Sequence, residues 1–198
     1  MSARLPNTYY VMRHGQSKAN EQGIIVSRLA TDQGGDYGLS ELGRQQARDA
    51  ASRSGLGSGT LIYSSDFARA WQTAEIVRAE LRAPAVTLAP ALRERCFGDW
   101  EGTSAGNYAA VWAADELDPG HQEHDVEPTA AVLARAIALI DALDKQHAGR
   151  DILLVSHGDT LQILQAGLAG IDPAAHRSLP HLRTAEIRQL ARTSPPAG

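Results

Sequence analysis

Short apolar runs alternate along this chain with longer stretches in which apolar residues recur at helical spacing. A short continuous apolar run is typical of a strand, and apolar residues three and four positions apart indicate a helix. The pattern predicts strands at residues 8–13, 60–63, 86–88, 151–155 and 185–190. It predicts helices from Ser40 to about Ser52, from Phe67 to Leu81, around 108–114, from 133 to 143 and near 160–168. This alternation favours an α/β fold with a mostly parallel sheet, in which 151–155 is a buried strand.

Two of the segments between these elements are long. A Gly- and Asp-containing loop lies within residues 21–38, and the segment 102–128 continues past its short helix into an acidic loop. We expect 102–128 to form part of a lid, because long irregular segments near binding sites often do so. We expect the tail 193–198 to be disordered and Asp159 to cap the helix near 160–168.

Length, composition and charge narrow the class of protein. The 198 residues are enough for one domain, 1–198, with a buried core. A content of 43% hydrophobic and 21% charged residues is ordinary for a soluble protein. The net charge of −4 gives no polybasic signature, which argues against nucleic acid as a partner. The single cysteine, Cys96, excludes an intrachain disulfide and a cysteine metal cluster. Because the sequence shows no apolar leader and no membrane-length apolar stretch, we expect a cytoplasmic protein with no membrane partner. The sequence does not indicate the oligomeric state.

Three polar turns each follow a predicted strand and carry the candidate chemistry. Arg13-His14-Gly15 follows the first strand, Ser156-His157-Gly158 follows the buried strand, and a turn at 64–66 leads into the helix that carries Arg69. Ligands of parallel sheets bind beyond the carboxyl ends of the strands, where helix N-termini also point. If the three strands are neighbours, two histidines and two arginines converge on one crevice.

These residue types suit phosphoryl transfer. A neutral imidazole can attack phosphorus and form a phosphohistidine. Arg13 and Arg69 would hold the phosphoryl oxygens, neutralise charge in the transition state and keep His14 unprotonated. Arg69 lies in the first turn of its helix, where the helix dipole opposes a cation unless an anion lies between them. Each residue alone is readily explained as structural or solvated, but together they indicate an anion site that contains a nucleophile.

A proton donor for the leaving oxygen is also needed, and Glu94 is the candidate. Burial and a nearby phosphate would both raise the pKa of Glu94 and favour the protonated acid. The alternative is a solvated Arg-Glu-Arg ion cluster. Physical reasoning alone does not select Glu94 over the other carboxylates, which are Asp66, Asp99, Glu101 and Asp159.

Three other features are interpreted as structural. The segment His121–Asp125 contains metal-ligand types, but it lies among acidic residues and prolines, so we expect a solvated loop and no metal site. Trp71, Trp100 and Trp112 are interpreted as packing residues. Gly55–Gly59 precedes a strand and lacks the Lys-Ser/Thr of a P-loop, which makes it a linker.

Five segments resemble, in order, the landmarks of the histidine phosphatase superfamily, the phosphoglycerate-mutase-like family. They are Arg13–Ser17 with Asn20, Leu39–Ala47, Ser64–Ala74, Leu92–Gly102 and Val155–Asp159, all within residues 9–168. The resemblance implies a three-layer α/β/α fold and an activity that needs no metal, and we expect no other cofactor. It implies that His14 is phosphorylated and that Arg13, Arg69 and His157 complete the phosphate pocket, with Gly158 beside them. It also implies that Glu94 gives and takes the proton and that Asn20 contacts the phosphoryl group or the substrate.

The family contains phosphatases and mutases, and this chain departs from the mutases in three ways. The loop Gly23–Gly38 replaces a tryptophan-containing stretch, Phe97–Trp100 stands where mutases have a tyrosine-glycine and a leucine, and mutases are usually longer. We therefore predict a phosphomonoesterase that acts on a small phosphorylated metabolite. The alternatives are a cofactor-dependent phosphoglycerate mutase and a binding module that senses a phosphorylated ligand. Specificity stays open, because Gln162 stands where an arginine is common and 102–128 has no basic cluster.

Overall fold

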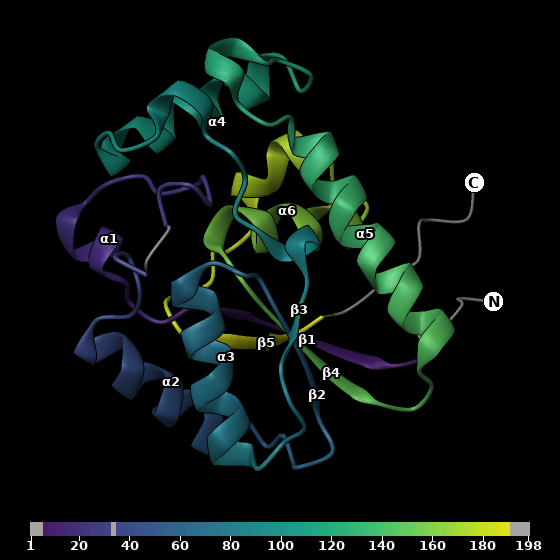
Figure 1. Cartoon of the computed structure of the whole chain (residues 1–198). Helices are drawn as coiled ribbons and strands as arrows, with labels where there is room; N and C mark the ends of the chain where they lie inside the picture. Colours follow the sequence, from purple (N-terminus) through teal and green to yellow (C-terminus); the bar gives the residue numbers. More distant parts are fainter. Residues whose placement is uncertain (1–5, 33–34, 191–198) are drawn as a thin grey trace, which may run out of the picture.

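Five strands form one sheet, in the order β3–β2–β4–β1–β5, in the computed structural model, which describes residues 6–32 and 35–190 (Figure 1). They are β1 (Thr8–Arg13), β2 (Leu61–Ser64), β3 (Thr87–Leu88), β4 (Asp151–Ser156) and β5 (Ile187–Gln189). The first four strands run parallel, and β5 pairs with β1 in the antiparallel sense. Arg13 pairs with Ser156 and Ser64 with Val155, so β1, β2 and β4 end together at one edge of the sheet.

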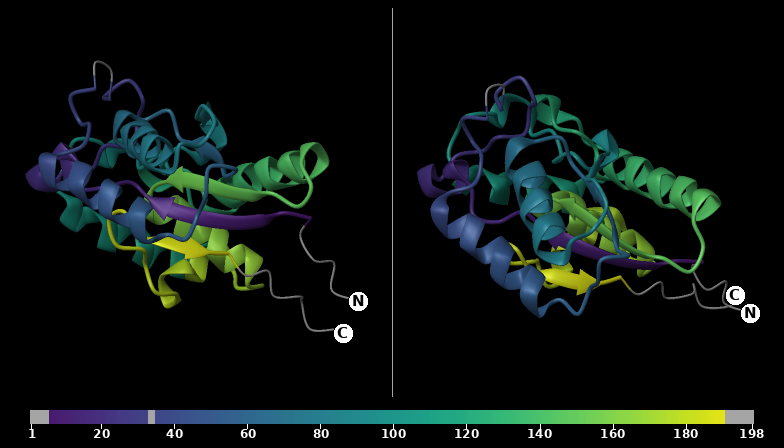
Figure 2. Two further views of the ribbon diagram at one scale, coloured as in Figure 1. Left: turned by 90° about the horizontal axis from the view of Figure 1, so that it is seen from below. Right: turned by 60° about the horizontal axis from the view of Figure 1, so that its bottom comes forward.

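Helices cover both faces of this sheet (Figure 2). They are α1 (Lys18–Gln22), α2 (Glu41–Arg53), α3 (Ala68–Leu81), α4 (Tyr108–Leu117), α5 (Thr129–Gln146) and α6 (Gly158–Leu168). Successive strand residues point to opposite faces. Tyr9 and Val11 pack against α5 and α6, whereas Met12 and Leu153 pack against α2 and α3. The predicted three-layer α/β/α fold with a mostly parallel sheet is confirmed.

Helix α4 has a small core of its own, apart from the two sheet faces. Its Val111 packs with Ile25, Phe97 and Val126. These residues come from the loop after α1, from the stretch after β3 and from the segment that leads into α5. In Figure 1 α4 lies at the top of the molecule. The core therefore joins three irregular segments of the chain into one packed unit.

Every predicted strand and helix is present, although α4 and α5 are longer than expected and β5 is shorter. The expectation that Asp159 caps α6 is wrong. His157 occupies the N-cap position in an extended conformation, and the Asp159 carboxylate accepts hydrogen bonds from Trp112 and His176 instead. Sequence periodicity missed the short helix α1 and the 3-10 segment Pro173–Ser178.

Two further expectations concern the ends of the chain and the membrane. The tail 193–198 lies outside the described residues. None of the helices in the described part of the chain is long and apolar enough to cross a membrane.

Candidate active site

His14 follows the last residue of β1 and is 3% exposed. Its Nδ1 lies 2.7 Å from the carbonyl oxygen of Gly15. Because a carbonyl oxygen only accepts, Nδ1 carries the ring proton and Nε2 is unprotonated. Arg69 Nε donates to this Nε2 at 3.2 Å. Burial lowers the pKa of His14 well below 6.5, and the charges of Arg69 and Arg13 lower it further. His14 is thus a neutral imidazole with its nucleophilic nitrogen beside a guanidinium.

Two glycines allow the loop after His14 to lie directly on the first turn of α2. A Cβ on Gly15 would lie 2.4 Å from the carbonyl oxygen of Gly43, and a Cβ on Gly43 would lie 2.0 Å from that of Gln16. The Gly15 N–H donates to Thr73 Oγ1 of α3 at 3.0 Å. The backbone next to His14 is therefore fixed by two helices at once, with no room for side chains between them.

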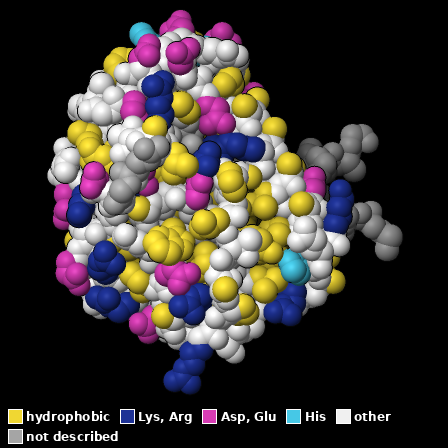
Figure 3. Space-filling view, viewed as in Figure 1, with side chains coloured by type: hydrophobic (Ala, Val, Ile, Leu, Met, Phe, Trp, Pro, Cys, Tyr) yellow, Lys and Arg dark blue, Asp and Glu magenta, His cyan; other side chains and the backbone are white. Residues whose placement is uncertain are grey.

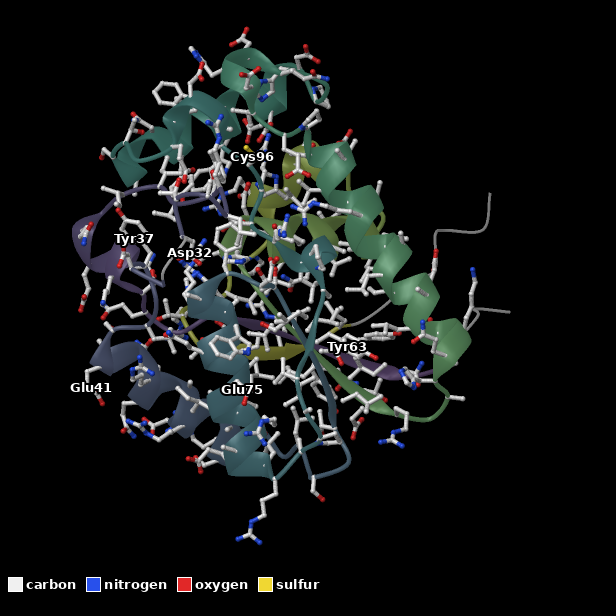
Figure 4. The ribbon with its side chains drawn as sticks, in the orientation of Figure 1. Asp32, Tyr37, Glu41, Tyr63, Glu75 and Cys96 are labelled. Carbon is white, nitrogen blue, oxygen red and sulfur yellow. The ribbon has the colours of Figure 1, made fainter. Side chains whose placement is uncertain are left out.

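Arg69 lies in the first turn of α3 and is 4% exposed. The N-cap of this helix, Phe67, has no side chain that can cap it. Asp32 supplies the cap from a distant loop: its Oδ2 accepts from the Ala68 N–H at 2.6 Å (Figure 4). Arg69 Nη2 donates to the carbonyl oxygen of Val26 at 2.8 Å. The guanidinium is thus held in place from the loop after α1 as well as by its own helix.

Arg13 and His157 complete the group that was predicted to converge. Arg13 Nη1 donates to the carbonyl oxygen of Leu182 at 3.0 Å. The His157 ring lies edge-on to the His14 ring, with 5.2 Å between their centroids. Its Nε2 lies 2.9 Å from Ser65 Oγ, and this hydroxyl can donate to Nε2. In that tautomer the ring proton of His157 is on Nδ1. Burial, followed by the charge of Arg69, lowers the pKa of His157 well below 6.5.

Three buried nitrogens of these residues have no hydrogen-bond partner among the described residues: Arg13 Nε, Arg69 Nη1 and His157 Nδ1. A buried N–H without an acceptor is costly, and each such group requires an explanation. An oxyanion beside His14 would supply acceptors to all three. The face in Figure 3 shows Lys and Arg interspersed with Asp and Glu, so this face carries no broad basic surface.

Glu94 lines the same cavity and is 9% exposed. Its Oε1 accepts from the backbone N–H groups of Arg95, at 3.0 Å, and Thr160, at 3.3 Å. These bonds all fall on one oxygen, which leaves Oε2 available for proton transfer. Burial raises the pKa of Glu94, and the neighbouring Asp159 carboxylate raises it further, against the effect of Arg69. Glu94 is therefore a buried acid in the cavity and not part of a solvated ion cluster.

The other carboxylates that the sequence left open are engaged elsewhere or exposed. Asp66 pairs with Arg93. Glu101 accepts from the backbone and hydroxyl of Ser27, and the Asp99 side chain is 66% exposed. Asp159 lines the cavity, but it accepts from Trp112 and His176, and these bonds with the charge of Arg95 lower its pKa despite the opposing effect of burial.

Asn20 and Gly158 also line the cavity. The side-chain oxygen of Asn20 accepts from the N–H and hydroxyl of Ser17, which closes a capping box at the start of α1. A Cβ on Gly158 would lie 3.4 Å from Arg13 Nε, so the absence of a side chain leaves space beside that guanidinium.

The cavity is about 310 Å³, at the lower end of the size of small-molecule sites. Several of its lining residues were not predicted from the sequence, and these are Tyr108, Trp112, Arg177 and His181. The four-residue spacing of Tyr108 and Trp112 on one helix face was the available signal for that pair. Nothing in the sequence pattern singles out Arg177, which lies in the unpredicted 3-10 segment.

The expectation of a solvated loop at His121–Asp125 is wrong for its first residue. His121 is 7% exposed, and its Nε2 lies 2.9 Å from Asp115 Oδ1. Asp115 also accepts two hydrogen bonds from the fully buried Arg95, at 2.6 and 2.7 Å. No group of three or more His, Cys, Asp or Glu side chains in the described ranges is placed to hold a metal ion. This buried charge cluster therefore attaches α4 to the strand-end segment that carries Glu94.

The chain is similar in sequence to known phosphatases and mutases. The family model of the histidine phosphatase superfamily (branch 1) matches residues 9–194. A glucosyl-3-phosphoglycerate phosphatase from Mycolicibacterium vanbaalenii is 32% identical over 172 residues, which cover 81% of this chain and 73% of the relative. A metal-independent phosphoserine phosphatase from Arabidopsis thaliana is 28% identical over 190 residues, covering 87% and 75%. A 2,3-bisphosphoglycerate-dependent phosphoglycerate mutase from a Methylobacterium species is 29% identical over 171 residues, covering 80% and 79%.

Among solved structures, a mycobacterial glucosyl-3-phosphoglycerate phosphatase in complex with VO3 superposes with a TM-score of 0.78. It is 30% identical, and the match covers 93% of this chain and 92% of that one. The similarity thus extends over nearly the whole of both folds.

Proposed function

The chain belongs to branch 1 of the histidine phosphatase superfamily, and we propose that it is a phosphomonoesterase that works through a phosphohistidine at His14. The observation that carries the proposal is the set of three unpartnered buried donors, on Arg13, Arg69 and His157, beside the unprotonated Nε2 of His14. The phosphatases among its relatives support net hydrolysis of a small phosphorylated metabolite.

In the first step, oxygens of the phosphoryl group accept hydrogen bonds from Arg13 Nε, Arg69 Nη1 and His157 Nδ1. The hydrogen bond from Arg69 Nε to His14 Nε2 breaks, the freed lone pair attacks phosphorus, and the bond from phosphorus to the ester oxygen breaks. Glu94 gives its proton to the departing oxygen, so an alcohol leaves and Glu94 becomes a carboxylate. The two guanidiniums stabilise the charge that spreads over the transferring group.

In the second step, the Glu94 carboxylate takes a proton from water, whose oxygen attacks the phosphorus bound to His14. The bond between phosphorus and Nε2 breaks, inorganic phosphate leaves, and His14 is again neutral while Glu94 is again protonated. One group therefore acts first as acid and then as base, which its raised pKa suits. Neither step in this proposal needs a metal or another cofactor.

The surroundings of the cavity support further parts of the proposal. Tyr108 and Trp112 of α4 line the cavity, which supports the role of the segment 102–128 as a lid over the substrate within one domain, 1–198. Asn20 and Gly158 line the same cavity, which supports their role in binding the phosphoryl group or the rest of the substrate. The lone cysteine and the ordinary charge content support a cytoplasmic location.

Hydrolysis of phenyl phosphate in the presence of EDTA tests the proposal. We expect stoichiometric phosphate release from the natural chain and none above background from His14→Ala, whereas His124→Ala, a change at an exposed histidine, should keep full activity. Undiminished turnover by His14→Ala would overturn the assignment. Interconversion of phosphoglycerates that depends on a bisphosphoglycerate primer, without net phosphate release, would identify a mutase instead.

A further inference from the structure

A buried group of charged side chains adjoins Glu94 and has no part in the two steps proposed above. Asp159, in the first turn of α6, lies at its centre and is buried. Its Oδ1 accepts from Trp112 Nε1 at 2.9 Å and lies 3.0 Å from His176 Nε2. Its Oδ2 accepts from Arg95 Nη1 at 3.4 Å. One carboxylate therefore joins α4, the 3-10 segment that carries His176 and the segment that carries Glu94.

The His176 ring is positively charged, because both of its nitrogens face acceptors. The side chain is fully buried. Its Nδ1 lies 2.8 Å from the carbonyl oxygen of Pro173, which only accepts, and its Nε2 faces the Asp159 carboxylate. Burial raises the pKa of Asp159, but the hydrogen bond and charge of His176, with the charge of Arg95, hold this pKa below its usual value. Asp159 is therefore ionised, and His176 donates from both nitrogens as an imidazolium.

The charges of this group are balanced without Glu94. Arg95 donates two hydrogen bonds to Asp115, at 2.6 and 2.7 Å. His176 pairs with Asp159. The two cations of the group thus match its two carboxylates. A third negative charge, on Glu94, would have no cation of the group as a partner, and an unpaired buried charge is costly.

Crossed contacts between neighbouring residues connect Glu94 to Asp159. Glu94 Oε1 accepts from the N–H of Thr160, which follows Asp159 in the chain, at 3.3 Å. Asp159 in turn accepts from Arg95, which follows Glu94. Both carboxyl groups line the cavity. Burial is the main cause of the raised pKa of Glu94, and the charge of Asp159 is the next, so the contacts and the electrostatics agree.

The other ionisable groups near Glu94 and Asp159 have partners or roles of their own. Arg69 lowers the pKa of Glu94, against the effect of Asp159, but a bound phosphoryl group would offset the charge of Arg69. The remaining groups are Arg13 of the phosphoryl pocket, Arg135 of α5, which pairs with Glu127, Arg177, which donates to Gln162, His121, which contacts Asp115, and Tyr108, whose pKa is raised by burial.

From this arrangement we propose that Asp159 and His176 are a positioning pair for the acid of the site. The Asp159 carboxylate keeps the Glu94 carboxyl group protonated, and the His176 imidazolium keeps Asp159 ionised and in place. Neither residue exchanges a proton with the substrate. Because Asp159 also holds Trp112, the same pair fixes an aromatic wall of the cavity relative to the acid. The inference rests on the proposed phosphomonoesterase function.

The test measures kcat/KM for an alkyl phosphate against pH. Its fall at high pH follows the ionisation of Glu94 in the free enzyme. Asp159→Asn keeps the side-chain shape but removes the negative charge, so this fall should move to lower pH by about one unit. His176→Gln keeps a donor for Asp159 but removes the positive charge, so the fall should move to higher pH. Asp141→Asn, an exposed change on α5, is the matched control and should leave the profile as it is.

The directions of the two shifts separate the outcomes. Shifts in the same direction, or no shift, would overturn the inference while phosphate release by the natural chain leaves the phosphomonoesterase intact. Each variant tests the sign of one charge, so one folded variant is enough to decide.

Two comparisons assign the effect to the acid. p-Nitrophenyl phosphate needs no proton for its leaving group, so an equal loss of kcat/KM for both substrates, with an unmoved profile, would indicate a purely structural role and overturn the inference. The fall at high pH should be absent in Glu94→Gln, and a fall that persists there would belong to another group and also overturn it. If the natural chain hydrolysed neither substrate, the proposed function itself would fall, and the inference with it.

Discussion

Replacing Glu94 by glutamine removes the proposed proton donor while it keeps the shape of the side chain. The amide oxygen of glutamine can still accept from the backbone N–H groups of Arg95 and Thr160, which bond to Oε1 in the structure. The substitution also removes a carboxyl group that burial and the neighbouring Asp159 disfavour in its charged form. We therefore expect Glu94→Gln to fold normally and to lose catalytic activity without a loss of stability.

The size of the loss depends on the leaving group. General acid catalysis contributes about 10²- to 10⁴-fold, or about 2.7 to 5.4 kcal/mol of transition-state stabilisation. An alkyl phosphate needs this proton, so its kcat/KM should fall by that factor. The p-nitrophenolate group leaves without a proton, so kcat/KM for p-nitrophenyl phosphate should fall by less than about 10-fold. Its kcat should still fall about 10²-fold or more, because the second step needs Glu94 as a base.

Stopped-flow measurement of nitrophenolate release tests this difference. Glu94→Gln should give a burst of one equivalent per active site followed by slow turnover, since the phosphoenzyme forms but hydrolyses slowly. In the natural chain, kcat/KM for an alkyl phosphate should fall as the pH rises through the raised pKa of Glu94, and this limb should be absent in the variant. Glu116→Gln, an exposed change on α4, is the control. Equal losses for both leaving groups, with no burst, would refute the role of Glu94.

Three further predictions concern stability and can be read from urea unfolding. Gly43→Ala should destabilise the fold by about 1 to 3 kcal/mol, because the new methyl group would lie 2.0 Å from a backbone carbonyl oxygen. In a solvent-exposed helix the same substitution stabilises by about 1 kcal/mol. A gain in stability would therefore contradict the prediction. Asp115→Ala should lower the free energy of unfolding by about 3 to 5 kcal/mol, because the buried Arg95 then lacks its bidentate partner. A decrease of less than about 1 kcal/mol would show that the ion pair is not needed for stability. The pKa values of His14 and His157 are lowered in the folded state, so the unfolded state binds more protons below about pH 6.5. As the pH drops below that value, the free energy of unfolding should fall by up to about 1.4 kcal/mol per histidine per pH unit. A free energy of unfolding that does not change with pH in this range would contradict the prediction.

The parts of the fold that local pattern determines could be predicted from the sequence. The strands β1 and β4 are short apolar runs, and each is followed by a polar turn that carries a histidine, His14 or His157. Because the two strands are parallel, both turns lie at one edge of the sheet. Helix α1 escaped notice because five residues show no periodicity. Its capping box joins Ser17 to Asn20, where glutamate or glutamine is the usual partner.

The rest depends on contacts between segments far apart in the chain. Arg95 and His121 are polar residues, which a sequence alone would place on the surface. Both are buried, because Asp115 of α4 accepts a hydrogen bond from each of them. Arg177 is likewise an ordinary arginine until the fold brings it over Trp112. Burial of a charged residue is decided by its partner, and a single sequence does not reveal which partner it finds.

In the proposed mechanism His14 carries the phosphoryl group during turnover. The direct measurement is to mix Glu94→Gln with p-nitrophenyl phosphate, quench in base, digest the protein and analyse the peptides by mass spectrometry. We expect close to one phosphate per chain on the peptide that contains His14, lost on brief treatment with acid and absent when His14 is alanine. A burst of nitrophenolate with no phosphate on that peptide, or with phosphate on another residue, would contradict it.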